Sequence, residues 1–120
     1  MLIKSIAQVQ AFVAGDKTII QEWLHPKNDP VNVPYSIACA TMHAGMASLP
    51  HALQHSTEVY IIQAGKGTVY IDGAPYLVNA GDLVLIPAGA TQYIENTGTE
   101  ALRFLCLVSP PWQQADELVY

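Results

Sequence analysis

From Tyr35 onward the chain alternates short apolar runs with turn residues. Glycines recur between the runs, and Asp72-Gly73 is typical of a two-residue hairpin turn because both residues tolerate a positive φ. Short strands with turn residues between them at regular spacing are typical of an all-β sandwich or barrel. The pattern predicts strands over residues 36–43, 58–63, 68–71, 76–78, 83–86, 92–95 and 102–109.

The two ends of the chain differ from this β-rich body. Residues 1–34 form an irregular N-terminal arm, in which residues 19–25 are expected to be a short strand or a turn of helix ending before Pro26. Residues 35–110 are the expected barrel, and residues 111–120 are a tail that forms a short cap or a loose end. No helix of normal length and no internal repeat is visible, so we expect one barrel in a single domain.

Composition favours a domain that associates with a second copy of itself. Hydrophobic residues make up 51% of the 120 residues and charged residues only 12%, which suggests that part of the surface is buried between subunits. We therefore expect a homodimer, in which residues 4–33 pair with or cover a sheet edge of the partner. The net charge is −5 and the five basic residues are scattered, so nucleic acid and anionic membranes are not expected partners.

Signals for export or membrane insertion are not recognisable in the sequence. No apolar run reaches the roughly 20 residues that a membrane helix needs, and the first ten residues lack the apolar core of a signal peptide. A cytoplasmic location is expected. In that reducing compartment free thiols are expected at Cys39 and Cys106, and a disulfide is the alternative.

Two spaced motifs carry a resemblance to a known family. The first is a glycine, a histidine, a glutamate and a second glycine, at Gly45, His51, Glu58 and Gly65. The second has its fixed positions at Gly81, Pro87, Gly89, Gln92 and Asn96. In these spacings the chain resembles the cupin superfamily. The resemblance implies a cupin double-stranded β-helix, a jelly-roll-like antiparallel barrel whose mouth holds a metal or a small ligand.

Two positions depart from the cupin pattern. The second histidine of the first motif falls on Leu53, and the histidine of the second motif falls on Gln92. Of the three histidines and one glutamate that bind metal in cupins, His51 and Glu58 remain, and His55 lies two residues beyond Leu53. The flanking residues resemble a branch of small, mostly uncharacterised bacterial and archaeal single-domain cupins. Leucine and glutamine are ordinary at these two places in that branch, which argues against simple decay.

The candidate metal ligands are therefore His51, His55, Glu58 and Gln92. Strand side chains alternate between faces, so His51 and Leu53 share a face, and a bulge or turn over residues 54–57 would also turn Glu58 inward. An imidazole, a carboxylate and an amide oxygen suit a divalent transition metal such as Fe, Mn, Ni, Zn or Cu. Glutamine is a weaker ligand than histidine, so metal binding should be weak unless His55 supplies a second nitrogen.

Each candidate also has a purely structural interpretation. His51 can be a hydrogen-bonded histidine that lines a dry pocket, and Glu58 a partly exposed strand carboxylate. Gln92 can be a polar wall that binds substrate without metal, and His55 an exposed loop residue. The candidate catalytic residues are His55, as a general acid or base, and Tyr60, which shares the face of Glu58 and can equally be a lining residue.

Two functions follow from these alternatives. The first is a metal-binding cupin that acts on a small polar organic molecule, as a metal-dependent enzyme of the isomerase, lyase or dioxygenase type. The second is a non-catalytic binding or sensor protein for a small ligand, in which Leu53 marks a drier pocket. Barrels of this kind serve both uses, so the fold alone does not decide between them.

Overall fold

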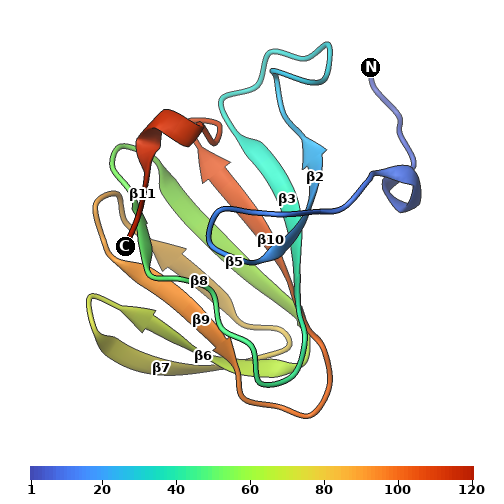
Figure 1. Cartoon of the computed structure of the whole chain (residues 1–120). Helices are drawn as coiled ribbons and strands as arrows, with labels where there is room; N and C mark the ends of the chain where they lie inside the picture. The colour runs from blue at the N-terminus through green and yellow to red at the C-terminus, as the bar shows by residue number, and fades with distance from the viewer.

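The computed structural model describes residues 1–120 and consists of two antiparallel sheets that pack face to face (Figure 1). The six-stranded sheet has the order β1 (Phe12–Val13), β2 (Ile19–Leu24), β3 (Ser36–Met42), β10 (Leu102–Ser109), β5 (Thr57–Ala64) and β8 (Leu83–Ile86). The five-stranded sheet has the order β11 (Glu117–Val119), β4 (His51–Leu53), β9 (Gln92–Asn96), β6 (Lys66–Ile71) and β7 (Ala74–Asn79). The all-β class that the sequence predicts is confirmed.

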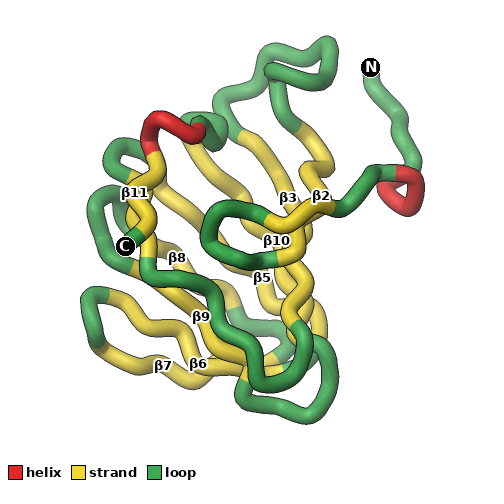
Figure 2. Tube along the Cα trace, viewed as in Figure 1, coloured by secondary structure: helices red, strands yellow, loops and turns green.

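Helical structure is limited to two short 3-10 turns, one near each end of the chain (Figure 2). They are η1 (Ile6–Gln8) and η2 (Gln114–Asp116). Neither turn has the length or the hydropathy to cross a membrane. Almost all regular structure of the chain is therefore strand.

The expected hairpins form where the turn residues predict them. Between β6 and β7, Asp72 has a φ of 49° and Gly73 a φ of 83°, the left-handed backbone that a two-residue hairpin turn requires. At the turn between β5 and β6, Gly65 has a φ of 83°, and a Cβ atom there would stand 2.7 Å from the Ala101 carbonyl oxygen. Glycine is required at position 65 for both reasons.

The hydrophobic core lies between the two sheets. Along β10 every second side chain is buried, namely Leu102, Phe104, Cys106 and Val108, because strand side chains alternate between the two faces of a sheet. Phe104 packs against Tyr60 of the neighbouring strand with ring centroids 4.7 Å apart. The same alternation turns Glu58, Tyr60 and Ile62 of β5 inward, so this sheet presents polar as well as apolar side chains to the interior.

Both terminal segments are built into the sheets. In the N-terminal arm, β2 pairs with β3 of the same chain. The expected contact of this arm with a sheet edge of a partner stays a prediction. The connection over residues 25–35 is short, so pairing within the chain costs little loop entropy. The C-terminal tail, expected as a cap or a loose end, adds β11 to the edge of β4.

Cys39 and Cys106 are free thiols in this structure. Both are buried, and they belong to paired strands, where Cys39 lies opposite Leu105 and Cys106 opposite Ala38. Cys106 faces the interior between the sheets.

Candidate functional site

A cavity of about 300 Å³ lies inside the barrel, between the two sheets and the two terminal segments. Its charged wall is entirely acidic, because no lysine or arginine lines it. Thirteen of its 22 lining residues are hydrophobic, so the polar groups are concentrated in a few places. The polar lining residues that matter below are Asp16, Glu22, His51, Glu58, Tyr60 and Glu117.

His51, on β4, is held in one orientation. Its side chain is 4% exposed, and its Nδ1 lies 2.8 Å from the Leu49 carbonyl oxygen. A carbonyl only accepts, so Nδ1 carries a proton, and in the neutral ring Nε2 keeps its lone pair. Nε2 makes no hydrogen bond, and its nearest charged neighbour is Asp16 Oδ2, at 3.7 Å. This is the arrangement in which histidine binds metals, with the second nitrogen fixed by a carbonyl.

Asp16 reaches His51 from the loop between β1 and β2. Its backbone carbonyl accepts a hydrogen bond of 2.8 Å from the Leu49 N–H. Leu49 therefore positions both Asp16 and His51, through its N–H and its carbonyl. Its Oδ1 accepts the Thr18 N–H at 3.0 Å, which leaves Oδ2 free toward His51. Figure 1 shows this blue loop crossing in front of the larger sheet.

Glu117 reaches the same place from the other end of the chain. It lies on β11, opposite Leu53 of β4. Burial raises the pKa of its carboxyl group, the positive charge of a protonated His51 opposes that rise, and the negative charge of Asp16 adds to it. One ligand atom from each of Asp16, His51 and Glu117 lies within 4.8 Å of the others. We call these three residues the terminal cluster.

Sequence reasoning missed two members of this cluster. Asp16 lies in a turn and Glu117 in a polar tail, and neither belongs to a motif. The only signal was that both are carboxylates in segments outside the barrel motifs. Their meeting depends on pairing between distant parts of the chain, which no local pattern records.

Glu58, on β5, is buried as its strand position predicts. Burial raises the pKa of its carboxyl group to about 7. The charge on His51 and a hydrogen bond from the Gln92 amide oppose the rise, and the carboxylates of Asp16 and Glu117 add to it. Glu58 can therefore hold or release a proton near neutral pH, although it is not a member of the terminal cluster.

Tyr60 and Gln92 form a buried pair beside Glu58. The Tyr60 hydroxyl donates a hydrogen bond of 2.5 Å to Gln92 Oε1, and Gln92 lies opposite His51 in the pairing of β4 with β9. Burial raises the pKa of Tyr60 well above its usual value, so the phenol stays protonated. The Gln92 oxygen, which is the atom that would bind a metal, accepts the hydrogen bond of the Tyr60 hydroxyl here.

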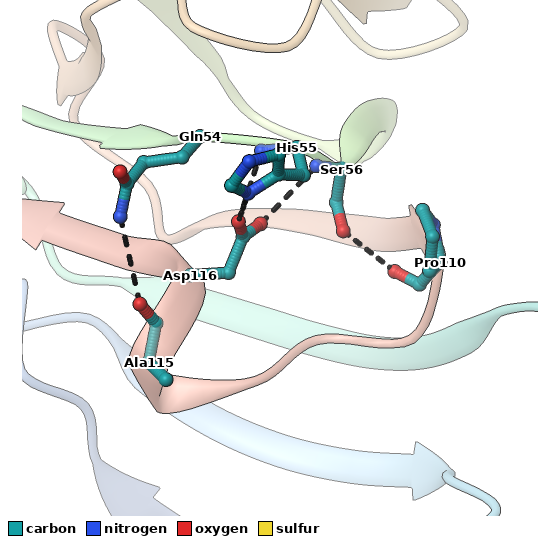
Figure 3. A network of polar contacts seen from close by, with 6 residues as sticks. All are labelled: Gln54, His55, Ser56, Pro110, Ala115 and Asp116. Carbon is teal, nitrogen blue, oxygen red and sulfur yellow. Dashed lines mark hydrogen bonds and ion pairs between the residues drawn. The ribbon is translucent and has the colours of Figure 1, made fainter.

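His55 is not brought together with His51. It follows β4 with its side chain 84% exposed, and it does not line the cavity. Its Nδ1 lies 2.8 Å from Asp116 Oδ1, and that carboxylate also accepts the backbone N–H groups of His55 and Ser56 (Figure 3). Burial opposes ionisation of Asp116, but these hydrogen bonds lower its pKa overall. His55 is thus part of a clasp between the β4–β5 turn and the C-terminal tail.

The residues of the terminal cluster fit a divalent cation. An imidazole nitrogen with its lone pair free and two carboxylates form a mixed nitrogen and oxygen set, which Mn²⁺, Fe²⁺ and Zn²⁺ accept. The thiol of Cys106 also lines the cavity but does not belong to the terminal cluster. Burial raises its pKa, and the charge of Glu58 raises it further.

Comparisons with known proteins agree with this fold. A cupin-domain family model matches residues 39–108. An uncharacterized protein of Methanocaldococcus jannaschii is 34% identical over 109 residues, which cover 91% of this chain and 86% of that protein.

Two solved structures share the fold at low identity. A predicted oxalate decarboxylase of Thermotoga maritima has a TM-score of 0.79 at 19% identity, over 91% of this chain and 99% of that one. A variant of a Streptomyces nucleoside dehydratase, solved with uridine, has a TM-score of 0.81 at 13% identity, over 100% of this chain and 90% of that one. By its matching family model and its archaeal relative, this chain belongs to the cupin-domain family.

Proposed function

We propose that this protein binds a divalent transition metal through His51 and uses the adjoining cavity to bind and convert a small polar organic molecule. The observation that carries the proposal is the His51 ring, whose Nδ1 is fixed by Leu49 while the lone pair of Nε2 faces a cavity lined by carboxylates. The cavity volume of about 300 Å³ suits a small molecule. The solved relatives named for oxalate and for a nucleoside support ligands of this size.

The chain's own proton-transfer group is Glu58 in this proposal. The group lines the cavity and titrates near neutral pH, which is the property that a general acid or base needs. The sequence offered His55 as the general acid or base, but its exposure and its bond to Asp116 support a structural role. Tyr60, through Gln92, keeps a hydrogen-bonded polar wall next to Glu58.

A bound metal would supply Lewis-acid polarisation of a substrate oxygen. The chain's contribution is orientation and exclusion of water. Leu49 keeps His51 in the tautomer that presents Nε2, and the apolar side chains of Leu53 and Phe104 restrict where a ligand can lie. These features support a reaction of the isomerase, lyase or dioxygenase type, in line with what the motifs imply.

The alternative is a non-catalytic binding or sensor protein. Leu53 favours it, because an apolar side chain takes the place of the second motif histidine and is 3% exposed in the cavity wall. In that case Glu58, Tyr60 and Gln92 would recognise a ligand by hydrogen bonds and would move no proton.

The metal content of untagged protein tests the proposal. We expect about one equivalent of a transition metal in the native chain or after reconstitution, and its loss in His51→Ala. Protein that stays empty after addition of Fe, Mn, Ni, Cu and Zn salts would remove the metal from the proposal.

To separate catalysis from binding, uridine and oxalate serve as probes, with Glu58→Gln as the variant. Turnover that Glu58→Gln abolishes supports an enzyme, and binding of either probe without turnover supports the alternative.

We also propose that the chain is a homodimer. The outer face of the six-stranded sheet carries exposed Ile61, Leu83 and Leu85, and Ile61 lies directly opposite Leu83 in the pairing of β5 with β8. A second copy is the occupant that the low charged fraction of the chain supports. Light scattering should give the mass of a dimer, and Leu83→Lys should give a monomer. A monomeric native chain would reject the proposal.

A further inference from the structure

The carboxylates that group with His51, with ligand atoms all within 4.8 Å of one another, come from the two terminal segments of the chain and not from the cupin motifs. Building on the proposed metal binding at His51, we propose that Asp16 and Glu117 are the other two protein ligands. In this arrangement the cation joins the loop between β1 and β2 to strand β11 across the cavity. This ligand set differs from the one that the motifs imply, which consists of His51, Glu58 and position 92.

The geometry of the terminal cluster supports this assignment. Ligand atoms of Asp16, His51 and Glu117 lie within 4.8 Å of one another, a spacing that modest side-chain movement would convert to metal–ligand bonds of roughly 2.0–2.2 Å. Neither Glu58 nor His55 belongs to the group. The cluster therefore offers one nitrogen and two carboxylates around a common point.

An independent observation points to a ligand at that point. His51 is 3% exposed, yet its Nε2 makes no hydrogen bond and is directed toward Asp16 at 3.7 Å. No lysine or arginine lines the cavity to balance Asp16 and Glu117. Asp16 and Glu117 are both partly buried, and His51 is the only group near them that can carry a positive charge. Charges removed from water are ordinarily paired or bind a metal, and a divalent cation here would meet both the free nitrogen and the two carboxylates.

The backbone holds both carboxylates in place. Leu49 donates its N–H to Asp16 and accepts the Nδ1 proton of His51, each at 2.8 Å. Glu117 lies between two backbone hydrogen bonds that hold the C-terminal segment. The Asp116 carbonyl accepts the Gln54 N–H at 2.9 Å, and the Tyr120 N–H donates to the Pro50 carbonyl at 2.8 Å.

The motif positions are less available to a cation. Leu53 has no ligand atom, and Gln92 Oε1 accepts the Tyr60 hydroxyl. Glu58 accepts a hydrogen bond from the Gln92 amide. The replacement of two histidines thus leaves Glu58 as the one charged motif residue that shares the cavity with His51, and the terminal segments supply two further carboxylates.

A cation in this position would couple metal binding to closure of the cavity. The loop over residues 14–18 belongs to a hairpin whose first strand, β1, has two residues, and β11 has three. Such short pairings open easily. A shared cation would tie them together, so amide exchange in residues 14–18 and 117–119 should slow when metal is added.

The test measures Co²⁺ and Zn²⁺ binding to the full, metal-free chain by calorimetry and by the cobalt absorption spectrum. We expect Asp16→Asn and Glu117→Gln each to weaken affinity by more than about tenfold, since even losing an outer-shell partner costs 10–100-fold. The matched control is Glu22→Gln, which removes a carboxylate of the same cavity outside the cluster and should stay within about twofold of the native chain. Glu58→Gln should bind as the native chain does.

Each other outcome has a definite meaning. If Glu58→Gln loses the metal while Asp16→Asn and Glu117→Gln keep it, the motif set holds the cation and the proposed ligands are wrong. If the native chain binds neither ion, the proposed metal function itself fails. Amide exchange guards against a folding artefact, because a misfolded variant exchanges throughout β5 and β10, whereas a variant that lacks only the cation exchanges faster only in residues 14–18 and 117–119.

Discussion

The cavity has two walls that are held in different ways. One wall consists of β5 and β10, long neighbouring strands in the middle of the larger sheet, and it carries Glu58, Tyr60 and Phe104. The other consists of the β1–β2 loop and the three-residue β11, and it carries Asp16 and Glu117. The first wall is fixed by core packing and the second by a few hydrogen bonds. A site that binds and releases a ligand can use this difference, because its weakly held wall can open while the barrel stays folded.

Truncation of the core should have the largest effect on the first wall. Phe104 is 2% exposed and packs on Tyr60, so Phe104→Ala should destabilise the fold by about 3–5 kcal/mol through a cavity. Leu118→Ala, on β11 and 43% exposed, should change stability by less than about 0.5 kcal/mol. Urea unfolding of both variants checks the contrast. Equal effects would mean that the two walls are equally important to the fold.

The free energy of unfolding should depend on pH through the protonation of Glu58. Its pKa is raised from 4.5 to about 7 in the folded state, so between these values the folded chain holds a proton that the unfolded chain has released. Stability must therefore fall as the pH rises through this window, by on the order of 3 kcal/mol. Unfolding of metal-free native protein and of Glu58→Gln, at pH 4.5 and 8, measures the difference. A variant with the same pH dependence as the native chain would show that Glu58 titrates normally.

The clasp of the second wall should respond to Asp116. Asp116→Ala removes the acceptor of the His55 and Ser56 backbone N–H groups. We expect the free energy that holds the C-terminal tail against the β4–β5 turn to fall by about 1–3 kcal/mol. The loss should be local, with faster amide exchange in residues 114–119 and unchanged exchange in β5 and β10. Metal affinity should also fall, since Glu117 is the next residue. Faster exchange in all strands would instead make the tail part of the core.

The exposed half of the clasp should matter least. His55→Ala removes an ion pair whose histidine is 84% exposed, which is expected to cost less than about 1 kcal/mol. The backbone N–H of residue 55 can still bind Asp116, and metal content should not change. Loss of stoichiometric metal in this variant would return His55 to the list of ligands.

Much of the first wall could be predicted from sequence because it obeys local rules. Turn residues separate the strands, and the two-residue period of β5 places Glu58, Tyr60 and Ile62 on one face. The spacing of the two motifs identified the fold, and the confirmed strand over residues 102–109 required no more than its apolar run and flanking turns.

The second wall could not be predicted because its contacts are long-range. Asp16 meets His51 only after Leu49 bonds to the β1–β2 loop, and Glu117 arrives through the pairing of β11 with β4. His55 resembled a ligand by its distance along the chain from His51. Strand β4, however, ends at Leu53, so the turn that follows directs His55 outward to Asp116.

An anomalous-difference map from crystals soaked in Mn²⁺ or Co²⁺ tests the central claim most directly, since it locates the cation without reference to activity. The account predicts one strong peak bonded to His51 Nε2 and to carboxylate oxygens of Asp16 and Glu117, at roughly 2.0–2.2 Å. A peak bonded to His51, Glu58 and Gln92, with Asp16 and Glu117 away from it, would contradict the account.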